Sequence, residues 1–132
     1  MEQLRLGFLS SHGGSNMQAI FDACKAGRLD AIMCVVISNN SRSAALRRAG
    51  REQVPFYHLS ERTHPGPENL DGAILRTLEK HEVNLVVLAG FYFTVSLEVS
   101  DGVDTLITNK RLVVKLAPHP LREAVDLSVA LD

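Results

Sequence analysis

A segment near the start of the chain has the residue types needed to bind an anion: positions 11–16 read Ser-His-Gly-Gly-Ser-Asn. Adjacent glycines let the backbone approach a ligand closely, and the unpaired N–H groups of a first helical turn would face that ligand. The helix dipole adds about 0.3–1 kcal/mol toward an anion at an exposed terminus, and about 2 kcal/mol at a partly buried one. The segment therefore predicts a phosphate site, to which Ser15 adds a hydroxyl donor.

The same segment also has a purely structural interpretation, because Ser and Asn are favoured helix N-caps and Gly-Gly is common in turns. The residues alone leave both interpretations open. No Lys follows the glycines as in a Walker A loop, and the G-x-G-x-x-G spacing is absent. The next apolar run ends in Ser-Asn-Asn at 38–40, without an acidic residue to hold an adenosine ribose. These features disfavour NAD and favour a ligand with one phosphate on a smaller sugar.

The cysteines and histidines suggest no metal site. Cys24 and Cys34 lie ten positions apart, without C-x-x-C spacing or a neighbouring His cluster, so we interpret them as reduced core thiols. His12 borders the predicted phosphate site. His81 ends a predicted helix, where a cation would favourably meet the dipole. We therefore expect neither a metal nor a disulfide.

Strand and helix patterns alternate through the first ninety residues and would position the loop. The apolar run at 31–37 is typical of a strand buried on both faces, and Pro55 indicates an edge strand. This alternation predicts an α/β fold with a doubly wound, mostly parallel sheet and right-handed crossovers. The predicted strands are 4–9, 31–37, 54–59 and 84–89, the predicted helices are 16–26, 44–49 (ended by Gly50) and 70–78, and 61–67 is a predicted loop.

The composition limits the class of protein. A length of 132 residues predicts a single domain, 1–132. The formal net charge is -1, from 14 Lys and Arg against 15 Asp and Glu, which disfavours nucleic acid as a partner. The longest apolar run, 31–37, is too short to cross a bilayer, and no leader pattern stands at the amino end. We expect a cytoplasmic protein without a membrane partner.

The pattern weakens after Phe91. Residues 111–116 could form a strand and 121–131 a final amphipathic segment, whereas 100–109 has no clear period. No return strand or capping helix is recognisable before Asp132, so we expect the sheet to be incomplete at its C-terminal end. The uncovered edge would allow a homodimer.

Four stretches, in order along residues 3–91, resemble the phosphoribosylglycinamide formyltransferase family. The resemblance implies a Rossmann-like formyltransferase fold, with 1–91 as its nucleotide-binding half and 92–132 as a divergent or truncated segment. The stretches are Ser-His-Gly-Gly-Ser-Asn-Met-Gln-Ala-Ile at 11–20 followed by Asp-Ala-Cys at 22–24, Val-Ile-Ser-Asn-Asn at 36–40, His-Leu-Ser-Glu-Arg-Thr-His-Pro at 58–65, and Leu-Val-Val-Leu-Ala-Gly at 85–90.

The resemblance implies a purine-biosynthesis enzyme that moves a formyl group from 10-formyltetrahydrofolate, a cosubstrate, to the amino group of glycinamide ribonucleotide, without a metal. By motif match, the ribonucleotide phosphate would bind at Gly14, Ser15 and Asn16. This agrees with the argument from the helix terminus. The folate pocket would begin at Tyr92, Phe93, Thr94 and Val95, whose types do not reproduce the family's usual run.

The chain departs from the family's catalytic signature, which is an Asn-x-His-Pro stretch supported by a distant Asp. The nearest match here is Ala-Pro-His-Pro at 117–120, which makes His119 the candidate general acid. A competing hypothesis is a non-catalytic module that binds a phosphoribosyl ligand or a partner, as a truncated or frame-shifted family member would. Methionyl-tRNA formyltransferase shares the chemistry, but this chain has no additional basic domain to hold tRNA.

Overall fold

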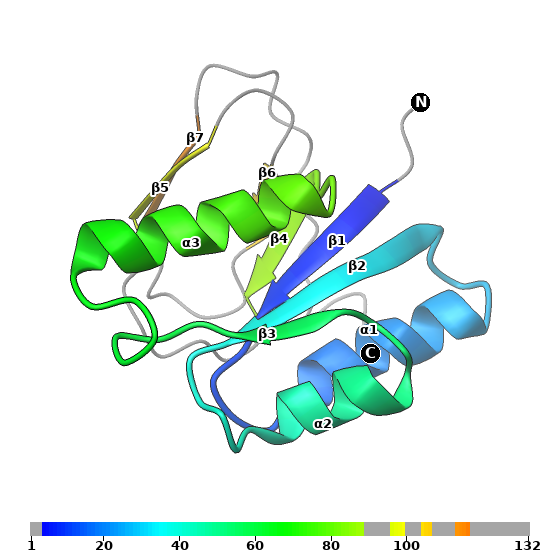
Figure 1. Cartoon of the computed structure of the whole chain (residues 1–132). Helices are drawn as coiled ribbons and strands as arrows, with labels where there is room; N and C mark the ends of the chain where they lie inside the picture. The colour runs from blue at the N-terminus through cyan, green and yellow to red at the C-terminus, as the bar shows by residue number, and fades with distance from the viewer. Residues whose placement is uncertain (1–3, 89–95, 100–103, 107–112, 117–132) are drawn as a thin grey trace.

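The computed structural model describes residues 4–88, 96–99, 104–106 and 113–116. In this part of the chain, strands and helices alternate up to β4 (Figure 1). Their order is β1 (Leu4–Leu9), α1 (Ser15–Lys25), β2 (Ala31–Ser38), α2 (Ala44–Arg51), β3 (Phe56–His58), α3 (Pro67–Lys80) and β4 (Leu85–Leu88), followed by β5 (Ser96–Val99), β6 (Asp104–Leu106) and β7 (Val113–Leu116).

The main sheet has the strand order β3-β2-β1-β4-β6, and every pairing in it is parallel. The chain runs outward from β1 to β3 and then returns to place β4 on the other side of β1. This arrangement is the expected doubly wound α/β sheet. β3 lies at the edge, as Pro55 predicted, because proline lacks the N–H that an inner strand must donate.

Both faces of the sheet are buried under helices. Leu70, Ile74 and Leu78 of α3 pack on one face, whereas α1 and α2 cover the other. Along β4, Val86 and Leu88 face α3, and the alternate residues face α1 and α2. Gly7 of β1 lies close under α3, since a Cβ there would be 2.7 Å from Leu78 Cδ2. The continuous apolar runs of the strands thus have the predicted cause, which is burial on two faces.

Three elements differ most from their predicted bounds, whereas α1, β2 and the start of β4 differ by about one residue. β3 covers only Phe56–His58, because Pro55 precedes the strand and contributes just its carbonyl, which accepts from the Val36 N–H. α3 begins at Pro67 rather than after it, since the first helical turn has no use for the N–H that proline lacks. α2 continues through Gly50 to Arg51 and ends where Gln53 takes a positive φ of 59°.

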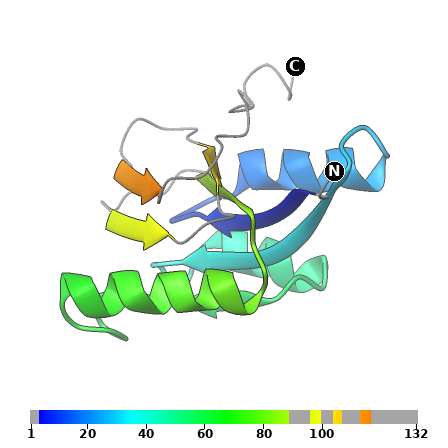
Figure 2. The same cartoon turned by 90° about the horizontal axis from the view of Figure 1, so that it is seen from above.

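Of the strands after residue 95, one extends the main sheet and two form a sheet of their own. β7 confirms the strand predicted within 111–116. β6 falls in the stretch that showed no clear period, and its pairing with β4 carries the main sheet one strand further. β5 and β7 form a separate parallel pair beside α3 (Figure 2). Residues 121–131 lie outside the described residues.

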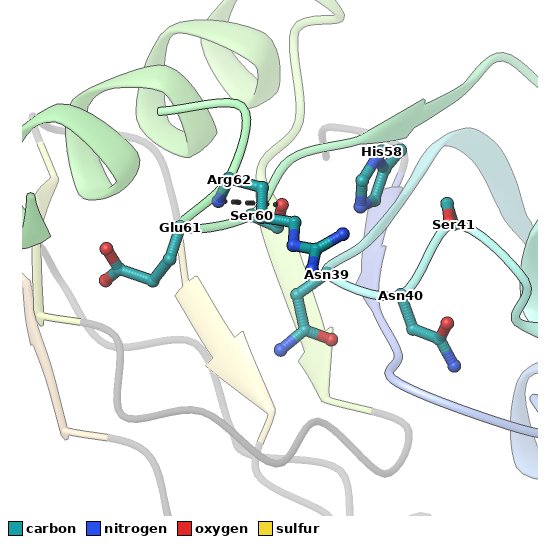
Figure 3. A pocket seen from close by; sticks show the side chains of 7 residues that line it. All are labelled: Asn39, Asn40, Ser41, His58, Ser60, Glu61 and Arg62. Carbon is teal, nitrogen blue, oxygen red and sulfur yellow. Dashed lines mark hydrogen bonds between the residues drawn. The ribbon is translucent and has the colours of Figure 1, made fainter. Parts of the chain in front are cut away.

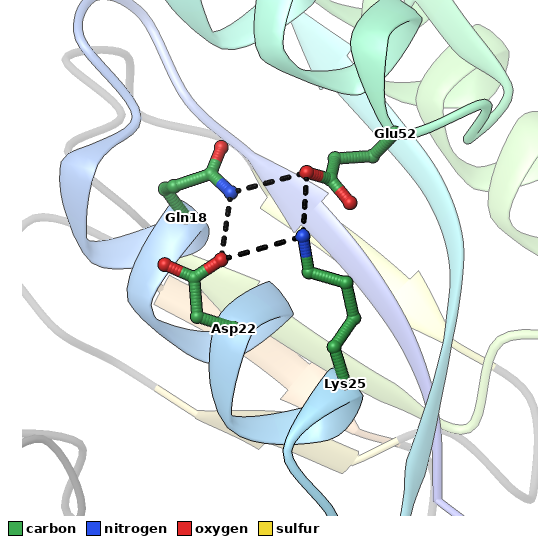
Figure 4. A network of polar contacts seen from close by, with 4 residues as sticks. All are labelled: Gln18, Asp22, Lys25 and Glu52. Atoms are coloured by element: carbon green, nitrogen blue, oxygen red, sulfur yellow. Dashed lines mark hydrogen bonds and ion pairs between the residues drawn. The ribbon is translucent and has the colours of Figure 1, made fainter.

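A polar network on the surface joins α1 to the end of α2 (Figure 4). Lys25 Nζ lies 2.9 Å from Glu52 Oε1 and 3.6 Å from Asp22 Oδ1. Gln18 Nε2 donates to the same two carboxylates, at 3.4 Å and 3.0 Å. The Lys25 ammonium lowers the pKa of Glu52, and Glu52 in turn raises the pKa of Lys25. The network therefore holds the outer side of α1 against the C-terminal end of α2.

Candidate functional site

The carboxyl ends of β1, β2 and β3 lie side by side, and the loops that follow them form one edge of the sheet. The chain winds to β2 on one side of β1 and to β4 on the other. Ligands of open α/β sheets bind where the winding direction changes in this way. The loop after β1, which contains the predicted phosphate site, stands at that point.

Helix α1 begins without a side-chain cap. Gly14 is the N-cap, with φ 71° and ψ 23°, and no side chain accepts from the first turn. The first hydrogen bond of the helix runs from the Gln18 N–H to the Gly14 carbonyl at 2.8 Å. Ser15 and Asn16 are exposed, and neither serves as the N-cap. Their side chains are therefore not used to cap the helix, and whether the loop binds an anion stays a prediction.

Three consecutive carbonyls of the β1–α1 loop are held by the segment that runs from the end of β2 into α2. A trans peptide points its C=O and N–H in opposite directions, and no cis peptide occurs among the described residues. The N–H groups of Gly13 and Gly14 therefore point away from α2, and that of Ser15 points out of the helix end. The three contacts are Asn40 Nδ2 to Ser11 O at 3.1 Å, Ala45 N to His12 O at 3.0 Å, and Arg48 Nε to Gly13 O at 2.8 Å.

Gly14 lets the loop press against α2. A Cβ at this position would lie 3.0 Å from both Cα and Cβ of Ala45 and 3.3 Å from Met17 Cε. The positive φ is a second reason for glycine, because an L side chain rarely adopts it. Ser11, which is buried, fixes the start of the loop by donating from Oγ to Asn39 Oδ1 at 2.7 Å. The amides at the start of α1 are thus held in place by tertiary contacts.

A pocket of about 470 Å³ lies next to this loop, at the carboxyl ends of β2 and β3 (Figure 3). No motif of the sequence predicted this pocket. Polar residues follow both β2 and β3, and because the carboxyl ends of neighbouring parallel strands meet at one edge of a sheet, that pattern was a usable signal. The lining residues are Asn39, Asn40, Ser41, His58, Ser60, Glu61 and Arg62.

The structure places some of the predicted site residues and not others. Gly14, Ser15 and Asn16 lie together at the N-terminus of α1. Five other candidates lie outside the described residues: Tyr92, Phe93, Thr94, Val95 and His119. Their roles stay predictions.

The described residues contain no group of three or more His, Cys, Asp or Glu side chains that could hold a metal ion. Cys24 and Cys34 are both free, and burial raises the pKa of each thiol. None of the helices in the described part is long and apolar enough to cross a bilayer.

His81 differs from its expected role as a cation at the end of α3. Its Nε2 lies 2.8 Å from the Tyr57 hydroxyl. Burial lowers the pKa of His81, and the neighbouring Lys80 ammonium lowers it further. The residue does follow the last turn of α3, but its lowered pKa disfavours the expected cation.

Comparisons with known proteins identify the family to which the chain belongs. A formyl transferase family model matches residues 4–109. The phosphoribosylglycinamide formyltransferase of Haemophilus influenzae is 34% identical over 87 residues, which are 66% of this chain and 41% of that protein. The trifunctional purine biosynthetic protein adenosine-3 of Chironomus tentans is 36% identical over 91 residues, which are 66% of this chain and 6% of that protein.

A solved structure shows the same arrangement of the backbone. The glycinamide ribonucleotide transformylase 1 of Symbiobacterium toebii superimposes with a TM-score of 0.68 at 36% identity, covering 70% of this chain and 44% of that one. The chain thus spans less than half the length of each of these relatives. The family model covers most of the sequence, so the chain belongs to the formyl transferase family, and its N-terminal part is related to the phosphoribosylglycinamide formyltransferases.

Proposed function

We propose that this chain carries the nucleotide-binding half of a phosphoribosylglycinamide formyltransferase. In this proposal Gly14, Ser15 and Asn16 bind the phosphate of glycinamide ribonucleotide. The complete reaction moves a formyl group from 10-formyltetrahydrofolate to the amino group of that ribonucleotide, in purine biosynthesis. The division of the chain into this half, 1–91, and a divergent segment, 92–132, is part of the same proposal.

The proposal depends chiefly on the direction of the loop amides. Contacts to the β2–α2 segment occupy the carbonyls of Ser11, His12 and Gly13, so the amides of Gly13 and Gly14 point the other way. An anion at this end of α1 would accept from these amides and from the exposed hydroxyl of Ser15. The helix dipole favours the negative charge there by about 0.3–2 kcal/mol, depending on burial.

The catalytic part of the proposal depends on residues beyond the described ones. Tyr92, Phe93, Thr94 and Val95 are proposed to contact the folate, and His119 is the proposed general acid. The expected homodimer and cytoplasmic location also stay predictions.

A second function is a phosphoribosyl-ligand binder without turnover. One observation favours it: position 117 has Ala where the family signature has Asn. Losing a group that stabilises developing charge costs about 10²–10³ in rate, so binding would survive where turnover fails.

Two measurements on the full chain separate these functions. Isothermal calorimetry with glycinamide ribonucleotide tests the phosphate site, and a formyl-transfer assay with 10-formyltetrahydrofolate tests turnover. Binding with product supports the enzyme, and binding without product supports the binder. An absence of binding heat at millimolar ribonucleotide, together with an absence of product, would contradict both.

Ser15→Asp tests the site itself. A carboxylate among the amides repels phosphate at a few ångströms, so we expect ribonucleotide binding to be abolished. The fold should keep its stability, because an acidic residue is favourable in a first helical turn. Asn69→Asp is the control for the added charge, since it places a carboxylate in the first turn of α3 at an exposed position. It also removes the donation from Asn69 Nδ2 to the Pro65 carbonyl at 2.7 Å, so circular dichroism must first show that the variant is folded. Equal ribonucleotide affinity in the two variants would refute the assignment of Ser15.

A further inference from the structure

The pocket at the carboxyl ends of β2 and β3 is separate from the proposed phosphate loop, although two of its lining residues contact that loop. Asn39 and Asn40 line the pocket and also hydrogen-bond to Ser11, near the start of the β1–α1 loop. Ser38 pairs with His58 in the parallel register, so the residues that follow β2 and β3 emerge next to each other. The pocket therefore belongs to the same sheet edge, one strand away from the start of α1.

One wall of the pocket is basic. Arg62 and His58 both line it, and no carboxylate is paired with either side chain in the described part of the chain. Glu61 is the acidic lining residue, but its Oε2 accepts from the Gly66 N–H at 3.2 Å. Figure 3 shows the Glu61 carboxylate directed away from the other lining side chains, whereas the Arg62 guanidinium lies near Asn39.

A tight turn holds the backbone that carries Arg62. Ser60 Oγ accepts from the N–H groups of Arg62 and Thr63, and Thr63 Oγ1 accepts from the Ser60 N–H at 2.8 Å. The His64 N–H closes the turn on the Ser60 carbonyl at 2.8 Å. Because Ser60 is itself buried, the turn is anchored to the sheet, and Arg62 starts from a fixed position.

Donors complete the lining. The Oδ1 of Asn39 accepts from Ser11, which leaves its NH₂ group as the end that can donate to a ligand. Ser41 adds an exposed hydroxyl on the opposite side. A planar guanidinium beside amide and hydroxyl donors matches the geometry of a carboxylate or phosphate. The positive charge of Arg62 would repel a cationic ligand, and an apolar ligand would leave these donors without hydrogen-bond partners.

We infer that this pocket binds the oxyanion group, phosphate or carboxylate, of a small polar ligand, with Arg62 as the main anchor and Asn39 as a second donor. The site is additional to the proposed phosphate loop and does not require it. A volume of about 470 Å³ leaves room for more than the oxyanion group itself.

Nuclear magnetic resonance on the ¹⁵N-labelled full chain tests this inference. Inorganic phosphate and malonate are titrated separately, following the Nε–H of Arg62 and the side-chain NH₂ of Asn39. We expect saturable shifts of both signals with at least one probe. A response to phosphate alone indicates a phosphate ligand, and a response to malonate alone indicates a carboxylate ligand.

Arg62→Gln should raise the probe concentration that half-saturates the Asn39 signal about tenfold or more, which is the effect of losing one charge-assisted hydrogen bond. Arg62→Lys keeps the charge but loses the planar guanidinium, so its affinity for the probe should lie between that of the unchanged chain and that of Arg62→Gln. Arg62 is exposed, so neither change should unfold the chain, which circular dichroism verifies. Arg28→Gln is the matched control, because Arg28 is exposed and precedes the amino end of β2.

The inference is overturned if neither probe shifts the signals of Arg62 and Asn39. It is also overturned if Arg62→Gln binds the probe with the same affinity as Arg28→Gln. The amides of Ser15 and Asn16 appear in the same spectra. A failure of the phosphate loop is therefore seen separately from a failure of the pocket.

Discussion

Replacing Gly14 by Ala tests whether the β1–α1 loop is held against α2. The new Cβ would lie 3.0 Å from the backbone Cα of Ala45 and 3.0 Å from its Cβ, and neither atom can swing away as a long side chain would. The φ of 71° adds conformational strain for any L residue. Gly13 is the matched control, because a Cβ there meets nothing within 4 Å.

The magnitude follows from these two contributions. The left-handed conformation costs an alanine about 1–2 kcal/mol, and the close contact adds about 1–3 kcal/mol. The sum, about 2–5 kcal/mol, is a large part of the roughly 5–15 kcal/mol that stabilises a typical domain. Gly13→Ala should be neutral or should stabilise by about 0.4–1 kcal/mol through the unfolded state.

Urea unfolding followed by circular dichroism measures the difference. With an m-value of about 2 kcal/mol/M, the Gly14→Ala midpoint should fall by about 1–2.5 M, whereas that of Gly13→Ala should not fall. Ribonucleotide titration under native conditions should show a parallel loss of affinity for Gly14→Ala, because its loop is displaced. Equal midpoints for the two variants would refute the reasoning, since they would mean that the loop is not pressed against α2.

Two further predictions concern titratable groups. Burial lowers the pKa of His81 in the folded state below its ordinary value of 6.5, so the unfolded state binds more protons as the pH falls through 6.5. The free energy of unfolding should therefore decrease below pH 6.5, and His81→Gln should flatten this part of the profile. An unchanged slope in urea titrations at several pH values would contradict that role. Burial raises the pKa of the Cys34 thiol, which is only 7% exposed, so little nucleophilic thiolate is present at neutral pH. Cys34 should react with a disulfide reagent much more slowly in the native protein than in urea, with Cys24 reacting first. Equal rates for both thiols in the two conditions would show that Cys34 is not buried.

The local pattern of the sequence is enough to predict most of the first seven elements. The stripe of Met17, Ile20 and Phe21 identified α1, since a helix places such residues on one face, and all three are buried. The run at 31–37 identified an inner strand, because burial on both faces removes the alternation of polar residues. Alternating strands and helices then restricted the fold to a doubly wound parallel sheet.

Boundaries were predicted less well where the residue types do not show which residue adopts the backbone conformation that begins or ends a helix. Gly50 has the residue type of a helix end, yet α2 continues past it and stops where Gln53 adopts a positive φ. Likewise, the sequence predicts a helix from residue 16, in a segment rich in Ser and Asn, which are favoured N-caps. The structure uses Gly14 instead, because the loop must pass within contact distance of Ala45, which is distant in sequence.

The sequence by itself therefore determined the first seven elements, their order and the glycine-containing loop between β1 and α1, because these follow from short-range periodicity and turn-forming residues. Only the tertiary structure decided which way the loop amides point and that Asn39, His58 and Arg62 share a pocket. Both depend on the parallel register of β1, β2 and β3, which brings together residues that no local pattern connects.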